Sequence, residues 1–525
     1  MKITNWLAGV GALALTLGAT LPAPPARAEK VLKAVVHADL KILDPSWTTT
    51  YITNRYAYVV YDTLFALNSK FEPKPQMVDT WSVSDDKLTW TFTLRPGLKF
   101  HDGQPVTATD CVVSLKRWMV RDVMGQQLAD KVSSLDPVDT GTFKMMLKEP
   151  YALVLETLGK PSTSAYMMPE RIARTPASEQ ITASIGSGPF IMQRDQWKPG
   201  DKVVFVKNNA YVPRNEPPDY MSGGKIPKLD RLEWLYIPDA NTTLSALMTG
   251  EIDYFEAPPL DFIAMLEDNP DITVMQIDNL GVQGLIRPNS KNPPFDNYKA
   301  RQALLYMVNQ EDYMQAAVGN PKLYMKYCGA YFLCNSDAET DAGAIKKPDI
   351  AKAKALLAEA GYKGEKIVVL QPTDRAQYNA LTTVMIAELR AAGVNVDVQA
   401  ADWSTISIRR AKKDPIDKGG WNLFITTQAG PDVTTPITDV WFNSSCETAN
   451  VGWACDETLQ KLVTQWTREP ERAKRHAMLA DIQRRAYESV PFVPIGQFFQ
   501  PIAFRKNVTG VVPAGMPVYW NIDKK

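Results

Sequence analysis

Apolar residues occupy every second position over residues 88–94 and again over residues 143–147. A period of two places successive side chains on opposite faces of a strand, so both segments are predicted to be half-buried strands. An apolar run at residues 31–36 predicts an opening strand. Thr107 and Asp110 have the spacing of a capping box, which predicts the start of a helix between the two alternating segments.

Helical and strand-like patterns alternate in the second half of the chain. A helix is predicted over residues 350–360 and a buried strand over residues 367–370. A second helix, with apolar spacing from Leu381 to Leu389, ends at Gly393, and alternating valines predict a strand over residues 394–398. Two successive units of this kind indicate a mixed α/β (α+β) protein with a partly parallel sheet.

The N-terminal segment has the organisation of a secretory signal peptide. Lys2 precedes an apolar stretch at residues 6–21, and Ala26-Arg27-Ala28 forms a small-x-small cleavage site, so the mature chain is expected to begin at Glu29. A membrane anchor is the alternative, but the stretch is shorter than the roughly 20 residues of a spanning helix, and prolines follow it. Since no cysteine lies near the cleavage site to accept a lipid, we expect a soluble protein exported to the periplasm.

Composition limits the partners that need to be considered. The 525 residues include 58 basic and 58 acidic side chains, and 45% of the chain is hydrophobic. Removing residues 1–28 takes away two cations and no acid, which leaves a net charge of about −2. This balance gives no reason to expect nucleic acid or an anionic membrane as a partner. The length predicts two or three lobes, because a single core rarely extends this far.

Five cysteines agree with an oxidising compartment. Cys328 and Cys334 are close in sequence, as are Cys446 and Cys455, so we expect each pair to close a short loop, although sequence alone does not determine the connectivity. The fifth cysteine, Cys111, is not assigned to a disulfide. Because it shares a helical stripe with apolar residues, it is expected to be a buried thiol and not a nucleophile.

The sequence carries none of the common catalytic motifs. It has no G-x-x-x-x-G-K-[ST] loop, no G-x-S-x-G elbow and no H-E-x-x-H helix. His37, His101 and His476 are far apart and lack metal-ligand spacing, so neither a metal nor a cofactor is expected. Ser187 lies between two glycines before a strand, where a tight turn is the simpler interpretation. A hydrolase that uses a pair of carboxylates remains open, because Asp and Glu are too common to identify one from a single sequence.

Six motifs occur in order through residues 29–525 and together resemble one known family. They are residues 94–110 (beginning Leu-Arg-Pro-Gly-Leu-Lys-Phe-His-Asp-Gly), 186–190 (Gly-Ser-Gly-Pro-Phe), 246–253 (Ala-Leu-Met-Thr-Gly-Glu-Ile-Asp), 294–304, 353–362 and 490–495. On these motifs the chain resembles the family 5 extracellular solute-binding proteins, which serve ABC importers of peptides, nickel and opines. Most of the motif residues are turns or helix packing positions, so they indicate an architecture and not a ligand.

The resemblance implies a type II periplasmic binding protein, a monomer of two lobes that close on a small molecule and present it to an inner-membrane ABC permease. Lobe I is expected to be discontinuous and to carry an inserted subdomain. The expected divisions are 29–72, 185–278 and 496–525 for lobe I, 73–184 for its inserted subdomain, and 279–495 for lobe II.

The resemblance also points to four ligand-binding residues. Asp432, after a predicted strand at residues 421–427, corresponds to the aspartate that pairs with a peptide's ammonium group. Trp403 and Arg410 correspond to a tryptophan that walls the cavity and an arginine that reaches into it. Tyr51, in a polar segment after the first strand, is the candidate from the other lobe. The structural alternatives are a solvated loop aspartate for Asp432, a core position for Trp403 and a solvated helix charge for Arg410.

The ligand class remains open between several chemistries. Ala429 stands where the peptide binders usually have an aromatic residue, which weakens the case for peptides. A peptide or peptide-like ligand is nevertheless expected, with an opine-like compound, an oligosaccharide or a nickel chelate as alternatives. The chain is expected not to be an enzyme; a secreted hydrolase is the alternative from another class.

Overall fold

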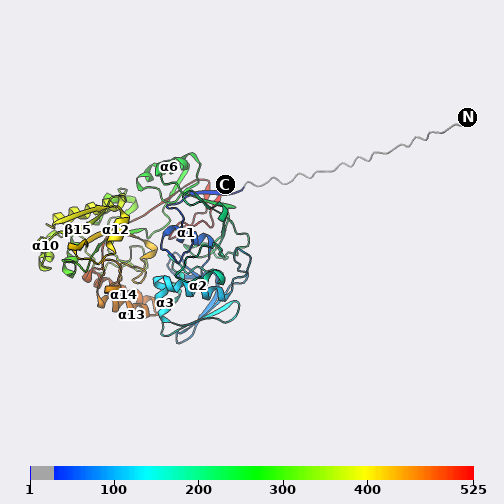
Figure 1. Cartoon of the computed structure of the whole chain (residues 1–525), viewed down its shortest axis with the longest axis horizontal. Helices are drawn as coiled ribbons and strands as arrows, with labels where there is room; N and C mark the ends of the chain where they lie inside the picture. The colour runs from blue at the N-terminus through cyan, green and yellow to red at the C-terminus, as the bar shows by residue number, and fades with distance from the viewer. Residues whose placement is uncertain (2–28) are drawn as a thin grey trace.

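The computed structural model describes Met1 and residues 29–525, which form two lobes (Figure 1). The first lobe, blue to green, lies on the right of Figure 1, and the second, yellow to orange, lies on the left. Apart from Met1, the predicted signal peptide lies outside the described residues. Within the described part of the chain, no helix has the length and apolar character that crossing a membrane requires.

A seven-stranded sheet forms the centre of lobe I, in the order β12-β19-β11-β1-β10-β9-β8. Its strands are β1 (Val31–Val35), β8 (Phe190–Met192), β9 (Lys202–Lys207), β10 (Arg231–Leu235), β11 (Tyr254–Phe255), β12 (Ile272–Met275) and β19 (Ile502–Arg505). The predicted opening strand is confirmed as β1, which runs parallel to β10 and β11. β19 comes from the end of the chain and lies antiparallel between β11 and β12. Lobe I is therefore discontinuous in sequence.

A four-stranded antiparallel sheet, in the order β4-β5-β7-β6, forms a separate layer of lobe I. Its strands are β4 (Val78–Val83), β5 (Thr89–Leu94), β6 (Val132–Pro137) and β7 (Thr142–Leu147), and its helices are α2 (Ala108–Arg121), α3 (Val123–Lys131), α4 (Val154–Gly159) and α5 (Glu170–Ala173). β5 buries every second residue, as its alternating pattern predicts. The predicted capping box is also confirmed, because Thr107 and Asp110 exchange side-chain-to-backbone hydrogen bonds at the start of α2.

Helix α1 (Tyr51–Val60) is held against the sheet of lobe I at two points. Midway along it, Arg55 forms an ion pair with Glu256, which is buried after β11 and also accepts hydrogen bonds from His37. At its end, Gly186 packs so closely that a Cβ there would lie 2.1 Å from the carbonyl oxygen of Val60. The Gly-Ser-Gly motif is therefore a packing turn, and it fixes the helix whose first residue is Tyr51.

Lobe II is built on a six-stranded sheet in the order β14-β18-β13-β17-β15-β16. Its strands are β13 (Val282–Pro288), β14 (Tyr324–Met325), β15 (Ile367–Pro372), β16 (Val396–Ala401), β17 (Leu423–Ala429) and β18 (Val493–Phe498), and its helices are α8 (Tyr298–Met307), α9 (Gln310–Ala317), α10 (Ile350–Glu359), α11 (Ala376–Ala391), α12 (Trp403–Arg410), α13 (Glu457–Arg468) and α14 (Arg472–Ser489). The predicted helix–strand units are confirmed, since β15 is parallel to β16 and β17. The second unit's strand begins at Val396, two residues later than predicted, because Val394 still belongs to the turn after α11.

The chain crosses between the lobes twice, after β12 and after β18. The expected boundary after residue 495 is wrong by about three residues: β18 continues to Phe498 because it pairs with both β13 and β14 in lobe II. The two crossings are in contact, since a Cβ at Gly281 would lie 2.2 Å from the carbonyl oxygen of Phe498. Gly281 has a φ of 63°, so glycine suits this position for its conformation as well as its size.

The remaining regular elements are peripheral to the two large sheets. They are α6 (Ala240–Thr249), α7 (Ile263–Glu267), and the two-stranded sheets β2 (Phe65–Leu67) with β3 (Pro73–Pro75) and β20 (Val508–Thr509) with β21 (Asp523–Lys524). In the structure, disulfides join Cys328 to Cys334 and Cys446 to Cys455. Cys111 is a free, buried thiol, and its burial raises its pKa well above the ordinary value.

Candidate functional site

A cavity of about 840 Å³ lies between the two lobes. Lobe I contributes the segment after β1, the junction of α2 and α3, and the loop after α4, whereas lobe II contributes α12, the end of β17 and the loop that follows it. The lining residues are Pro45, Ser46, Trp47, Thr48, Thr49, Tyr51, Trp118, Arg121, Asp122, Val123, Met124, Lys160, Ser162, Thr163, Trp403, Arg410, Thr426, Thr427, Gln428, Asp432, Ile437, Thr438, Val440 and Trp441. All four residues named from the sequence line this one cavity.

Tyr51 and Asp432 meet across the cavity. Tyr51 is the first residue of α1, and Asp432 ends a short 3-10 turn (Gly430–Asp432) that follows β17. The Tyr51 hydroxyl donates a hydrogen bond of 2.8 Å to Oδ2 of Asp432. Burial of the hydroxyl and the nearby Asp432 carboxylate raise the pKa of Tyr51 well above its ordinary value, so the hydroxyl stays protonated and remains a donor.

The turn that carries Asp432 is tied to the crossing between the lobes. The amide of Gly430 donates a 2.7 Å hydrogen bond to the carbonyl of Gly281, and a Cβ at Gly430 would lie 2.2 Å from the Cβ of Leu280. Only glycine fits this contact without displacement of the crossing segment. The position of the Asp432 carboxylate is therefore coupled directly to the segment in which the chain crosses from lobe I to lobe II.

Helix α12 places Trp403 and Arg410 on the same wall of the cavity. Asp402 caps the helix by accepting a hydrogen bond from the amide of Thr405, so Trp403 begins its first turn. Residues seven apart lie on the same helix face. The guanidinium carbon of Arg410 lies 4.9 Å from the centroid of the Trp403 ring, 5.1 Å from that of Phe424 and 5.6 Å from that of Trp441. Three aromatic faces thus surround the cation.

Arg410 has no anionic partner among the described residues. Its Nη1 atom is buried and makes no hydrogen bond, although it can donate two. Loss of hydration lowers the pKa of the guanidinium, but an arginine keeps its charge at neutral pH. A half-buried cation that stacks on ring faces and has no carboxylate partner retains the capacity to bind an anion such as a carboxylate.

Sequence reasoning missed a second arginine and tryptophan pair, in lobe I. The guanidinium carbon of Arg121 lies 4.6 Å from the centroid of the Trp47 ring, and its Nη2 donates a 3.2 Å hydrogen bond to the Trp47 carbonyl. No carboxylate pairs with Arg121 in the described structure, whereas Lys160 pairs with Asp122 at 2.6 Å. Trp47 precedes the polar segment of Tyr51 in sequence, but Arg121 carries no signal that separates it from a solvated helix end.

The described residues contain no group of three or more His, Cys, Asp or Glu side chains that could hold a metal ion. The cavity instead presents the Asp432 carboxylate hydrogen-bonded to a neutral hydroxyl, the ion pair of Lys160 with Asp122, and two arginines stacked on aromatic rings. Such a lining presents an unpaired anion and two cations within the part of the chain that the structure describes.

Comparison with known proteins identifies the class of the protein. The family described as "Bacterial extracellular solute-binding proteins, family 5 Middle" matches residues 72–450. The chain belongs to this family, and it is a two-lobed, type II solute-binding protein. The family resemblance inferred from the six motifs is confirmed.

Three relatives make the likeness specific. The chain is 39% identical over 501 residues, 95% of its length and 94% of the relative's, to a "Probable peptide ABC transporter periplasmic-binding protein y4tO" of Sinorhizobium fredii. The fold matches a dipeptide-binding protein from Pseudoalteromonas sp. SM9913 in complex with Met-Leu, with a TM-score of 0.75, 22% identity, and coverage of 94% of this chain and 100% of that one. It also matches the protein AgaA from A. tumefaciens R10 in complex with agropinic acid, with a TM-score of 0.76, 22% identity, and coverage of 94% and 99%. The relatives are binding proteins and not enzymes.

Proposed function

We propose that this protein is the exported receptor of an ABC importer and that it captures a peptide-like molecule carrying both an amine and a carboxylate. The molecule binds between the lobes, the lobes close on it, and the closed form delivers it unchanged to a permease in the inner membrane. The single observation that carries the proposal is the presence of two charges of opposite sign, Asp432 and Arg410, in one cavity, neither with an ion-pair partner among the described residues.

A zwitterionic ligand would supply an ion-pair partner for both Asp432 and Arg410. Its ammonium group would bind Asp432, whose present partner is the neutral hydroxyl of Tyr51. Its carboxylate would bind the guanidinium group of Arg410, which lines the cavity. Charge-assisted hydrogen bonds of this kind are roughly twice as strong as neutral ones, and they are strongest where water is excluded. Binding also links the lobes, because Tyr51 belongs to lobe I whereas Asp432 and Arg410 belong to lobe II.

The relatives support this chemistry. One relative is named a probable peptide ABC transporter periplasmic-binding protein, and one structural neighbour holds the dipeptide Met-Leu. The agropinic acid complex supports an opine-like acid as the second candidate ligand. Arg121 favours that second candidate, since it adds a cation without a carboxylate partner and makes the cavity more positive than a simple zwitterion requires.

Ligand capture would drive closure through differential affinity. A ligand shifts an equilibrium between open and closed forms only as far as it binds the closed form more tightly. Contacts from both lobes exist together only when the lobes are closed, so a ligand bound to Tyr51, Asp432 and Arg410 favours the closed form. The permease would then recognise the closed arrangement of the two lobe surfaces.

The decisive experiment is mass spectrometry of the small molecule that copurifies with the protein from its native host, followed by calorimetry with that molecule. The expected result is a compound with at least one amine and one carboxylate, bound in a one-to-one complex and recovered unchanged. A neutral sugar or a metal chelate would refute the ligand assignment. Release of a chemically altered product would refute the receptor role and favour a hydrolase.

Export is part of the same proposal. We propose that residues 1–28 are removed and that the monomeric mature protein begins at Glu29 in the periplasm. N-terminal sequencing of protein from the periplasmic fraction tests the cleavage site. A chain that keeps residues 1–28 in the membrane fraction would refute both the cleavage and the soluble location.

A further inference from the structure

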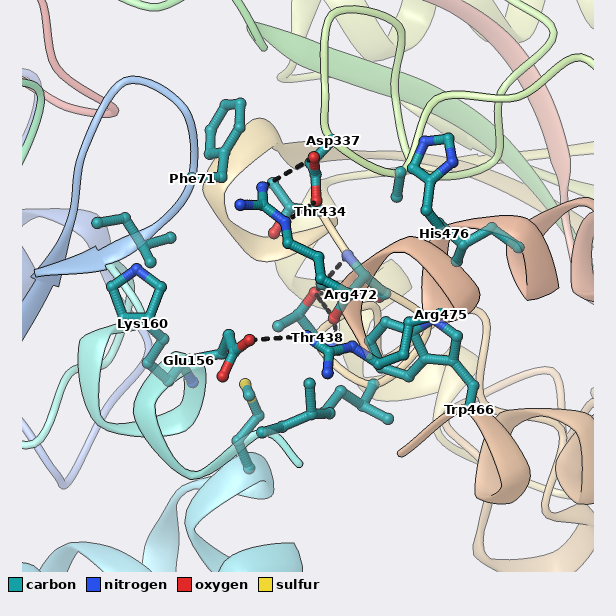
Figure 2. Close-up of a pocket in the computed structure, with 18 of the residues that line it drawn as sticks. Phe71, Glu156, Lys160, Asp337, Thr434, Thr438, Trp466, Arg472, Arg475 and His476 are labelled. Carbon is teal, nitrogen blue, oxygen red and sulfur yellow. Dashed lines mark hydrogen bonds and ion pairs between the residues drawn. The ribbon is translucent and has the colours of Figure 1, made fainter. Parts of the chain in front are cut away.

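A second, smaller cavity of about 130 Å³ adjoins the main one between the lobes (Figure 2). The same four side chains, Met124, Lys160, Ile437 and Thr438, line both cavities. The two spaces therefore have part of their walls in common. We call the smaller cavity the side pocket.

The walls of the side pocket are mainly apolar and come from both lobes. Lobe I contributes Leu67, Phe71, Pro73, Met124, Leu153 and Pro161, and lobe II contributes Ala338, Pro431, Ile437, Trp466 and Leu479. The pocket thus exists only while the two lobes lie against each other.

The charged residues around the side pocket are already paired. Figure 2 shows Arg475 of α14 reaching Glu156 of α4, at 2.9 Å, and Arg472 pairing with Asp337, also at 2.9 Å. This differs from the main cavity, where Arg410 has no carboxylate partner. An ionic group of a ligand would gain little in the side pocket, whereas an apolar group would gain from removal of its surface from water.

One polar atom of a residue that lines the side pocket is unsatisfied. Trp466, on α13, has only 4% of its surface exposed, and its indole Nε1–H has no hydrogen-bond partner. Buried donors in folded proteins nearly always have an acceptor. Because neighbouring atoms cover this Nε1–H, it does not face the open space of the pocket, and the Trp466 ring contributes an apolar wall.

We propose that the side pocket binds an apolar arm of the captured molecule, of about the size of a benzene ring, against the ring of Trp466. The size follows from the volume, because a cavity of about 150 Å³ in another protein accommodates benzene. The inference rests on the proposed function, since it assigns the arm to the same ligand. Because both lobes form the walls, the arm adds affinity only to the closed form and so strengthens closure.

The first experiment compares two dipeptides by calorimetry, alanylglycine and alanylphenylalanine. Ala338→Leu partly fills the side pocket, and Ala317→Leu on α9 makes the same change at a partly buried alanine that lines neither cavity. We expect native protein to prefer alanylphenylalanine, Ala338→Leu to lose about tenfold in affinity for it with alanylglycine unchanged, and Ala317→Leu to behave as native. Equal losses for both dipeptides, or no loss, would overturn the proposal. Thermal unfolding verifies that each variant is folded.

The second experiment needs no peptide, so it separates the side pocket from the proposed function. Benzyl alcohol, which carries an aromatic ring, is titrated into protein with ¹⁵N-labelled tryptophan, and Trp466→Phe identifies the Trp466 indole resonance. We expect benzyl alcohol to shift this resonance in native protein and in Ala317→Leu but not in Ala338→Leu. If the shift occurs while neither dipeptide binds, the side pocket stands and the peptide-like ligand assignment fails. If no shift occurs and filling the pocket changes no affinity, the side pocket proposal is overturned.

Discussion

The hydroxyl of Tyr51 donates a 2.8 Å hydrogen bond to Oδ2 of Asp432, and this bond joins the N-terminal turn of a lobe I helix to a lobe II turn. The carboxylate is thereby oriented toward the cavity before a ligand arrives. Since a neutral hydroxyl leaves the negative charge uncompensated, the same bond preorganises Asp432 for an ammonium group without neutralising it.

Replacement of Asp432 by asparagine should weaken binding of a ligand with a free amine by roughly 2–5 kcal/mol, because the shape is kept while the anion is lost. Folding should be nearly unaffected, since Asp432 is only partly buried. Calorimetry with the native ligand measures the change. Tyr51→Phe should cost less, about 0.5–1.5 kcal/mol, because it removes a neutral donor and keeps the charge.

The control for Asp432 is a ligand whose amine is acetylated. It should bind native protein poorly and lose little more on mutation, because the charge pair is already absent. The four affinities form a double-mutant cycle that gives the coupling energy directly. A coupling near zero would remove the ammonium role of Asp432.

Arg410→Gln should weaken binding of a carboxylate ligand by roughly 2–5 kcal/mol, and amidation of the ligand's carboxylate should abolish the difference. Arg409→Gln is the matched control: it is the neighbouring arginine on α12, and its guanidinium instead donates to the carbonyls of Gly419 and Gly420. Calorimetry on both variants makes the comparison. Equal effects of the two substitutions would refute a specific carboxylate site at Arg410.

Closure should depend on the ion pair between Glu156 and Arg475. The pair joins α4 of lobe I to α14 of lobe II, and the Arg475 side chain is only 9% exposed. Glu156→Gln should reduce ligand affinity by about 1 kcal/mol, a value that allows for the solvent exposure of Glu156. It should also increase the radius of gyration of ligand-free protein in small-angle X-ray scattering.

Glu149→Gln provides the contrast, since Glu149 contacts Arg468 in the other lobe through a more exposed pair at 3.3 Å. Exposed pairs contribute little, so this variant should bind ligand about as tightly as native protein. An effect as large as that of Glu156→Gln would show that burial does not distinguish the two pairs.

Acid should destabilise the fold through Glu256. Burial alone would raise its pKa, but Arg55 and His37 outweigh burial and lower the pKa from 4.5 to about 2. A depressed pKa stabilises the fold above about pH 4.5, and this contribution is lost as the pH falls toward 2. As the pH falls from 4.5 toward 2, native protein should lose about 3 kcal/mol of its free energy of unfolding through this group. Glu256→Gln should not show that loss when both proteins are unfolded with denaturant. Glu251→Gln, at an exposed glutamate, should keep the native profile.

The two disulfides should each stabilise the fold by about 2–3 kcal/mol, because each closes a short loop of the unfolded chain. Replacing Cys328 and Cys334 together by serine should lower the free energy of unfolding by that amount, and the same holds for Cys446 with Cys455. Peptide mapping without reduction tests the pairing. A bridge that includes Cys111 would contradict it.

Sequence reasoning recovered much of the fold because local physical chemistry determines the features it used. The alternation that predicts β5 follows from the period of a half-buried strand, and the Thr107 and Asp110 pair caps α2 through bonds only three residues apart. The end of β18 could not be predicted this way. Phe498 remains in lobe II because it pairs with β13 and β14, and those strands lie far from it in sequence.

The features of the candidate site also divide into those that local sequence determines and those that contacts between distant segments determine. The sequence by itself determined the family, through it the candidates Trp403 and Arg410, and the tight turn around Ser187, since these depend on residue type and local spacing. Only the tertiary structure decided that Tyr51 meets Asp432, that Arg410 lies among three aromatic rings without a carboxylate, and that Arg121 and Trp466 border the cavities. The physical reason is that the contacts and the solvent exposure of a side chain depend on which distant segments of the chain surround it. Local sequence patterns carry no information about those segments.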